Sequence, residues 1–199
     1  MHIDNFSSRG NSGLPIGGFN QNVMRSFHQK LDYDLIVLHY GTNVLNYGSY
    51  DYQWYQRNMG KVVQHLKNCF PGVAILVVST ADKSTKYKLE METDSAVIPL
   101  TKAQKEYALQ SEAGYFSLFD KMGGSGSMKK WVEADPALAN KDYTHFNYKG
   151  AQKVAAMIDE YLENGYKKYK ELRKNQNGVL GNPLNDSLKS QMNSTADVP

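Results

Sequence analysis

The chain has 199 residues, of which 41% are hydrophobic and 12% aromatic, and this composition is typical of one globular domain. Its 23 basic and 20 acidic residues leave a formal net charge of +3, which gives no indication of nucleic-acid binding. The single cysteine, Cys69, excludes a disulfide within the chain, and no apolar run reaches the length of a membrane span.

Two apolar runs predict buried parallel strands, and the sequence signals for the elements that precede them are weaker. Residues 2–6 are interpreted as the end of a strand, and residues 20–31 as a short helix. Residues 35–38 and 73–78 are continuously apolar, which is typical of strands covered on both faces. Between these two runs, residues 52–70 carry apolar side chains at intervals of three and four, as in an amphipathic helix. Strand, helix and strand in this order form a right-handed parallel crossover, so we expect an open α/β sheet.

The alternation of elements continues toward the C-terminus. Residues 101–113 predict a helix and residues 115–119 a short strand, and Ser127 is a candidate cap for a further short helix. A long final helix is expected from residue 149 to about residue 172, with Asn147 as its N-cap.

The last part of the chain loses this periodicity. Beyond Asn175 the sequence is rich in Asn, Ser, Gly and Pro. We therefore expect one domain over residues 1–174 and a disordered tail over residues 175–199.

A carboxylate stands three residues before a histidine in the segment Asp142-Tyr143-Thr144-His145. At this spacing the carboxylate can accept a hydrogen bond from the imidazole Nδ1–H, which holds a general base in one tautomer and one orientation. An isolated segment of this kind is more often a solvated loop that contains an incidental histidine. It therefore needs support from other parts of the chain before it indicates catalysis.

Two glycine-containing segments give that support. Gly41-Thr42-Asn43 follows the first buried strand, at the edge where open α/β sheets bind ligands. The Asn43 amide is suited to donate to a developing oxyanion, although glycine and asparagine are also ordinary turn residues. The segment Ser8-Arg9-Gly10-Asn11 lacks the lysine and the spacing of a phosphate loop, and the Gly10 N–H would be a second oxyanion donor.

The order of these segments resembles that of the SGNH (GDSL-like) hydrolase family, in which a glycine block, a Gly-x-Asn block and a terminal Asp-x-x-His block follow a nucleophilic serine. The resemblance covers roughly residues 3–162. It implies a three-layer α/β/α sandwich with a mostly parallel, flavodoxin-like sheet, and hydrolysis of esters or thioesters without a metal or an organic cofactor. By position it makes His145 the base, Asp142 its orienting carboxylate, Asn43 a side-chain oxyanion donor and Gly10 a backbone one.

The chain departs from the family because it contains no Gly-Asp-Ser block. Ser7, Ser8 and Ser12 lie in the loop that supplies Gly10 and lack the strand-to-helix turn that exposes a nucleophile. We therefore expect the chain to be the C-terminal portion of a longer enzyme, without the first strand of the sheet and with apolar strand edges exposed. The partner that this hypothesis requires is the missing N-terminal segment of the same protein.

Three residues are weaker candidates for substrate binding. His39 directly precedes the Gly41 turn, and Tyr47 and Trp54 belong to an aromatic-rich stretch where a sugar-stacking platform would be useful. Packing at the start of a helix explains the same aromatic residues. The histidines show no metal-binding spacing, so no metal site is expected.

The sequence thus predicts a serine esterase that hydrolyses acyl, preferably acetyl, esters of small molecules or carbohydrates in the parent protein, with this chain alone inactive. One alternative is a non-catalytic relic or carbohydrate-binding scaffold. Others are a lipase or thioesterase of the same fold and an enzyme that uses Asp142 and His145 without a covalent intermediate. Neither nucleic acid nor a membrane span is expected, and family analogy alone suggests a periplasmic or secreted location.

Overall fold

The centre of the fold is a three-stranded parallel sheet. The computed structural model describes residues 2–6, 10–45 and 51–180. The strands are β1 (Leu35–His39), β2 (Ala74–Val78) and β5 (Gly114–Phe116), in the order β1-β2-β5. Both pairings are parallel: Val37 on β1 lies opposite Leu76 on β2, and Leu76 lies opposite Gly114 on β5. The two strands predicted from apolar runs are therefore confirmed, together with the parallel crossover that joins them.

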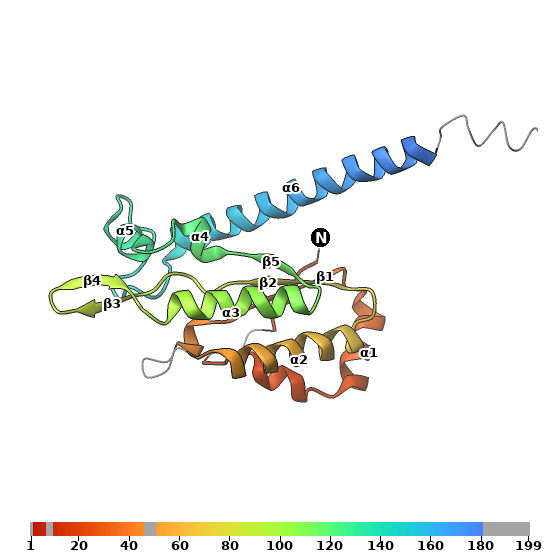
Figure 1. Cartoon of the computed structure of the whole chain (residues 1–199), viewed down its shortest axis with the longest axis horizontal. Helices are drawn as coiled ribbons and strands as arrows, with labels where there is room; N and C mark the ends of the chain where they lie inside the picture. The colour runs from red at the N-terminus through yellow and green to blue at the C-terminus, as the bar shows by residue number, and fades with distance from the viewer. Residues whose placement is uncertain (1, 7–9, 46–50, 181–199) are drawn as a thin grey trace, which may run out of the picture. The chain divides into compact units, whose positions relative to one another are not determined.

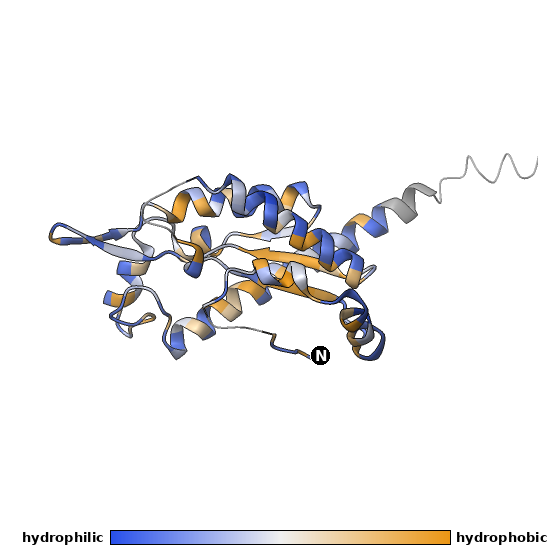
Figure 2. Ribbon diagram, turned by 90° about the horizontal axis from the view of Figure 1, so that it is seen from below, coloured by the Kyte–Doolittle hydropathy of each residue, from blue (hydrophilic) through white to orange (hydrophobic). Residues whose placement is uncertain are grey.

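Helices α2 (Gln53–Cys69) and α3 (Val97–Gln110) lie along the sheet and pack on one another (Figure 1). The apolar stripe of α2 is buried, with Met59 and Val63 fully inaccessible to solvent. Burying one side chain of this size stabilises the fold by about 2 kcal/mol. Figure 2 shows the hydrophobic residues concentrated on the strands and on the helix faces turned toward them. The helix predicted over residues 52–70 is confirmed.

The short helix α1 (Gln21–Leu31) packs against α2 at the edge of the core. Asn20 caps it, since its side-chain oxygen accepts the backbone N–H groups of Asn22 and Val23. A 3-10 turn, η1 (Leu14–Gly18), precedes it and also contacts α2. The prediction of a helix over residues 20–31 is thus confirmed, whereas residues 2–6 form no strand.

Strand β1 lies at an edge of the sheet in the described part of the chain, and one of its faces is open. Leu35 and Val37 are 36% and 46% exposed, while Leu38 is buried. The prediction that this strand is covered on both faces is therefore wrong. The structure confirms the expectation that a strand at the edge of the sheet exposes apolar groups.

An antiparallel hairpin that the sequence did not predict follows β2. It consists of β3 (Ser84–Tyr87) and β4 (Glu90–Thr93), and it projects beyond the carboxyl ends of the parallel strands (Figure 1). Helix α3 begins directly after it, four residues earlier than expected, because Pro99 is accommodated in its first turn.

The segment after β5 also differs from its prediction. The expected strand over residues 115–119 ends at Phe116, because Ser117 caps helix α4 (Leu118–Met122) by accepting the N–H of Asp120. Helix α5 (Ser127–Glu133) follows, and its N-cap is Gly126. The prediction that Ser127 is the cap is therefore wrong: the Ser127 hydroxyl donates to Asp82 instead.

The final helix, α6, spans Tyr148–Leu180. Asn147 caps it as predicted, since its side-chain oxygen accepts the N–H of Gly150. The helix continues past residue 175, where a disordered tail was expected, and residues 181–199 lie outside the described residues. The chain divides into two compact units, Met1–Ala155 and Ala156–Pro199. Within the described ranges, no helix combines the length and the apolar character needed to cross a membrane.

Candidate active site

Asp142 and His145 form the hydrogen-bonded pair that the sequence predicts. The Asp142 Oδ2 atom lies 2.9 Å from His145 Nδ1, and Oδ1 accepts the backbone N–H groups of Thr144 and His145, each at 2.9 Å. Because an ionised carboxylate can only accept, the proton between the two side chains must reside on Nδ1. The neutral ring therefore has an unprotonated Nε2. Since the His145 side chain is 72% exposed, the ring is accessible to a reacting group.

The backbone of this turn is held from both sides. Tyr143 has a φ of 55°, a left-handed conformation that is uncommon for a non-glycine residue. Its carbonyl accepts the N–H of Ser84 at 3.0 Å, and the His145 carbonyl accepts the N–H of Asn140 at 2.8 Å. These bonds connect the turn to the start of β3 and close it on itself, so the orientation of His145 is fixed by backbone contacts as well as by Asp142.

Two opposing effects set the pKa of the Asp142 carboxyl. Partial desolvation raises it, whereas the hydrogen bonds from the His145 backbone, the His145 ring and the Thr144 backbone lower it. The combined effect of the hydrogen bonds is larger than that of desolvation, so the pKa of Asp142 lies below its ordinary value. The carboxylate is therefore ionised at neutral pH, as an orienting group for an imidazole must be.

This lowered pKa predicts a small loss of stability in acid. Because the folded pKa lies below the unfolded one, the carboxylate stabilises the fold above about pH 3.9 and loses this contribution as the pH falls through the folded pKa. The side chain is 49% exposed, so solvent screening keeps the contribution below about 1 kcal/mol. We expect Asp142→Asn to lower the free energy of unfolding in urea at about pH 7 and to have almost no effect at about pH 2. An equal effect at both pH values would contradict this linkage.

The Gly41-Thr42-Asn43 segment forms a 3-10 turn, η2 (Thr42–Val44), directly after β1. Gly41 has a φ of 157°, and a Cβ atom added to it would lie 2.5 Å from the Cβ of Thr80. The backbone after β1 therefore approaches the loop after β2 more closely than any other residue would permit. The Asn43 side chain at the tip of this turn is exposed, as a donor to a substrate needs to be.

A buried glutamine fixes this close approach. Gln104 of α3 is fully buried; its Nε2 donates to the Tyr40 carbonyl, and its Oε1 accepts the Thr80 N–H at 2.8 Å. One side chain thus joins the ends of β1 and β2. This role is not predictable from the sequence, because a polar residue in an amphipathic helix is expected on the solvent-exposed face.

The glycine loop near the N-terminus is anchored to the same region. Gly10 has a φ of 66° and is exposed. Further along the loop, the Ser12 carbonyl accepts the Tyr55 hydroxyl at 2.9 Å. Gly13 packs against Tyr40 so closely that an added Cβ would lie 2.9 Å from its ring. The loop therefore reaches the residue that follows β1.

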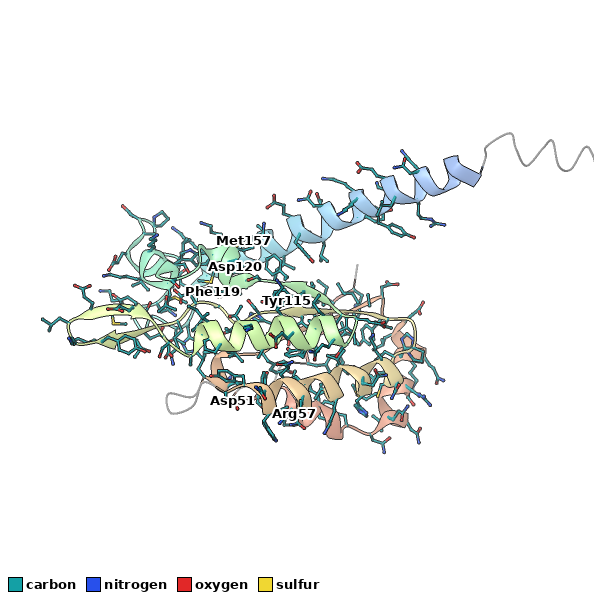
Figure 3. The ribbon with its side chains drawn as sticks, in the orientation of Figure 1. Asp51, Arg57, Tyr115, Phe119, Asp120 and Met157 are labelled. Atoms are coloured by element: carbon teal, nitrogen blue, oxygen red, sulfur yellow. The ribbon has the colours of Figure 1, made fainter. Side chains whose placement is uncertain are left out.

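The loop after β5 completes the carboxyl edge of the sheet. The backbone N–H of Phe119 donates to the Ser79 hydroxyl at 3.2 Å, which joins the ends of β5 and β2. Ser117 donates to Asp120 at 2.6 Å. Figure 3 shows Tyr115 on β5 and, after it, Phe119 and Asp120 at the start of α4.

Asn43 and the Asp142–His145 pair lie on loops at this edge, and the described contacts connect these loops indirectly. Gly41 contacts Thr80 after β2, and Ser84 in the same connection binds Tyr143. In the described part of the chain, no hydrogen bond joins Asn43 or Gly10 to His145. Their roles as oxyanion donors therefore stay predictions.

The weaker candidates have different outcomes. The His39 side chain is accessible at the end of β1, although surrounding protein desolvates the ring and lowers its pKa. Trp54, in the first turn of α2, is 61% exposed and available for contact with a ligand. Tyr47 lies outside the described residues.

A cavity of about 410 Å³ lies at the opposite end of the sheet, where Gly72, Val73 and Gly114 precede or begin the strands. Ligands of open α/β sheets bind at the carboxyl ends, so this cavity is not the candidate site. Within the described ranges, no three His, Cys, Asp or Glu side chains lie close enough together to hold a metal ion.

Solved structures match this chain, whereas no protein-family model and no curated protein sequence does. A peptidoglycan O-acetylesterase is 23% identical over 80% of this chain, with a TM-score of 0.70, and this chain spans 45% of that one. An acetyl xylan esterase is 16% identical over 72% of this chain and 76% of its own, with a TM-score of 0.50. A GDSL-like lipase from Bacteroides thetaiotaomicron is 18% identical over 78% of this chain and 73% of its own, with a TM-score of 0.52.

The fold is therefore of the α/β class, with a parallel sheet whose carboxyl-edge loops carry the candidate site. More closely, it is the fold of the SGNH-type hydrolases, to which these structural neighbours belong. The predicted fold class is confirmed.

Proposed function

We propose that this chain carries the base and the oxyanion donors of a serine esterase of the SGNH type. His145 Nε2 takes the proton of a serine hydroxyl as the serine oxygen attacks the ester carbonyl, and Asp142 stabilises the resulting imidazolium. The Asn43 amide and the Gly10 N–H donate to the oxygen that becomes negatively charged. His145 then returns the proton to the departing alcohol, and an acyl-enzyme remains for water to hydrolyse.

The observation that carries this proposal is the 2.9 Å hydrogen bond between Asp142 Oδ2 and His145 Nδ1. It selects the tautomer in which Nε2 can accept a proton, on a ring that solvent and substrate can reach. The turn that carries this ring is also held through its backbone, because the Tyr143 carbonyl accepts the Ser84 N–H and the His145 carbonyl accepts the Asn140 N–H.

The proposed mechanism requires a serine from sequence outside this chain, since none of the chain's own serines stands in a Gly-Asp-Ser motif. The open edge of β1 supports this requirement. A further parallel strand hydrogen-bonded to β1 would end beside the Gly41 turn and would cover part of the apolar surface at Leu35 and Val37. A nucleophile at the carboxyl end of such a strand would lie at the same edge of the sheet as Asn43.

The proposed substrate is an acetyl ester on a carbohydrate. Two of the structural neighbours are described as acetyl esterases, one of peptidoglycan and one of xylan. In this chain the exposed ring of Trp54 and the accessible His39 lie on elements that flank the Gly41 turn, where a sugar ring would find an aromatic surface. A lipase or thioesterase of the same fold is the alternative within this class.

Ester hydrolysis with and without the upstream sequence tests the proposal. The purified chain and the longest polypeptide encoded in the same reading frame are each given 4-nitrophenyl acetate and then a fluorophosphonate. We expect hydrolysis and labelling of one serine in the longer polypeptide alone, at a serine that precedes Met1. Labelling of Ser7, Ser8 or Ser12 in the purified chain would instead identify an internal nucleophile.

The same assay separates the rival functions. A reading frame without a further serine motif, and with no hydrolysis in either protein, would favour a non-catalytic carbohydrate-binding scaffold. That candidate rests on the absence of Gly-Asp-Ser from this chain. Hydrolysis without fluorophosphonate labelling would indicate general base chemistry by Asp142 and His145 with no covalent intermediate.

A further inference from the structure

Asp82 is a buried carboxylate that the proposed mechanism does not use. It lies in the loop after β2, and only 1% of its surface is exposed. Its Oδ2 atom accepts the Met128 N–H at 2.8 Å and the Ser127 hydroxyl at 3.3 Å. Desolvation raises the pKa of Asp82, and the hydrogen bonds from Met128 and Ser127 offset only part of that rise. Burying such a group costs free energy, so its presence here needs a reason.

One support of the catalytic turn begins two residues after Asp82. The Ser84 N–H donates to the Tyr143 carbonyl at 3.0 Å, and Tyr143 holds the left-handed conformation between Asp142 and His145. Ser84 is itself buried. The loop that contains Asp82 therefore positions the Ser84 N–H, which holds one side of the turn that carries Asp142 and His145.

The second support comes from α5, whose first residues bind Asp82. The Trp131 carbonyl on α5 accepts the N–H groups of Leu138 and Ala139, at 2.8 and 3.3 Å. The Trp131 ring also packs against Phe146, with centroids 5.4 Å apart. Phe146 directly follows His145, and Ala139 pairs with Phe146 across the loop. Helix α5 therefore holds both flanks of the segment that contains Asp142 and His145.

We propose that Asp82 is a positioning residue for His145, because its carboxylate joins these two supports into one unit. Asp82 touches neither Asp142 nor His145 and acts through Ser84 on one side and through α5 on the other. As a role in catalysis the inference rests on the proposed esterase function. As a structural coupling it is measurable in the chain as it stands.

Nuclear magnetic resonance of the His145 ring and amide tests the coupling. The ring ¹⁵N shifts report the Nδ1–H tautomer, and the amide exchange rate reports the hydrogen bond from His145 N–H to Asp142. In Asp82→Ala we expect at least tenfold faster exchange of the His145 amide and ring shifts moved toward a mixture of tautomers. Asp82→Asn keeps an oxygen that can accept the Met128 N–H, so it should restore most of the protection.

Asp94 provides a matched control. It is a second buried carboxylate, directly after β4, and it accepts the Ala96 N–H and the Thr85 hydroxyl, each at 2.9 Å. Asp94→Ala should lower stability without changing the His145 signals. Equal effects of Asp94→Ala and Asp82→Ala on His145, or no effect of Asp82→Ala, would overturn the proposal.

A measurement on the unmodified chain keeps the proposal testable where Asp82→Ala does not fold. Native-state hydrogen exchange in low urea should give one shared opening free energy for the amides of Ser84, Met128 and His145. The Ala96 amide, bound by Asp94, should open separately. Different opening free energies for the first three amides would also overturn the proposal.

Failure of this inference and failure of the esterase proposal are distinguishable. The exchange and tautomer measurements require no substrate, so they can confirm or contradict the coupling in an inactive chain. In the longer polypeptide, Asp82→Ala should lower kcat by at least tenfold with little change in KM, since it misplaces a base and removes no substrate contact. Intact ester hydrolysis after loss of His145 would contradict the esterase proposal alone.

Discussion

Replacing His145 by alanine should reduce kcat/KM for acetyl ester hydrolysis by at least about 10³-fold in the longer polypeptide that supplies the serine. The loss follows because His145 Nε2 is the atom that takes the serine proton in the proposed mechanism, whereas the Asp142 carboxylate lies on the Nδ1 side of the ring. Asp142→Asn should cost on the order of 10⁴-fold in kcat, since an amide donor facing Nδ1 selects the wrong tautomer. Steady-state kinetics with 4-nitrophenyl acetate measure both effects, and residual activity should come from substrate binding and the oxyanion donors.

His2 offers a matched control for this prediction. It too is an exposed histidine beside a carboxylate, with its Nε2 3.1 Å from Asp4 Oδ1. Its ring is 70% exposed, close to the 72% of His145. His2→Ala should leave kcat/KM within about twofold of the unmodified protein, because surface substitutions away from a site have small effects. Full activity after His145→Ala would exclude it as the base.

The parts of the structure that could be predicted from sequence are those set by neighbouring residues. The Asp142–His145 pair lies within one turn, so three residues of spacing suffice to predict their hydrogen bond. Helix α2 was recognised because its apolar stripe repeats with the helical period, and that stripe is what the sheet buries. The cap at Asn147 also depends on a contact only three residues away.

The β3–β4 hairpin was missed because no local signal specifies it. Its strands contain lysine and glutamate where a strand signal would need alternating apolar residues. The residue with a positive φ in its turn is Lys88, at 53°, whereas glycine or asparagine is the usual turn signal. Contacts from elsewhere hold it instead. Gly126 donates to Thr93, and Lys129 lies 2.9 Å from Glu90, so α5 supports a hairpin that precedes it by some thirty residues along the chain.

The assembly of the candidate site depends on contacts of the same long-range kind. Gln104 joins the residues after β1 and β2, and Asp82 joins the loop after β2 to α5. Both are polar residues whose importance arises only because folding buries them. The sequence predicts a chemical role for Asn43 and for His145, but the loops that carry them are joined through these buried polar bridges, which no spacing rule describes.

Gly150→Ala should strongly destabilise the chain and displace the Asp142–His145 turn. Gly150 is in the first turn of α6, and a Cβ atom added there would clash with the Leu138 carbonyl oxygen. That carbonyl also accepts the Asn147 N–H, so the neighbour that must move belongs to the backbone that flanks Asp142 and His145. We expect a loss of about 3 kcal/mol or more, which for a chain of this size lowers Tm by roughly 6–12 °C.

Gly165→Ala is the control that separates this clash from the general effect of replacing a helical glycine. It lies in the same helix, and an added Cβ would meet no atom within 4 Å. Alanine there should stabilise the helix by up to about 1 kcal/mol, so the two substitutions should shift Tm in opposite directions. Thermal unfolding followed by circular dichroism measures both changes in Tm. If Gly150→Ala has the same Tm as the unmodified chain, the Leu138 carbonyl can move away from the added Cβ at little cost, and the prediction is wrong. If it cannot, the closeness of α6 to residue 138 is what holds the loop that carries His145, and the same substitution should weaken the His145–Asp142 hydrogen bond without touching either residue.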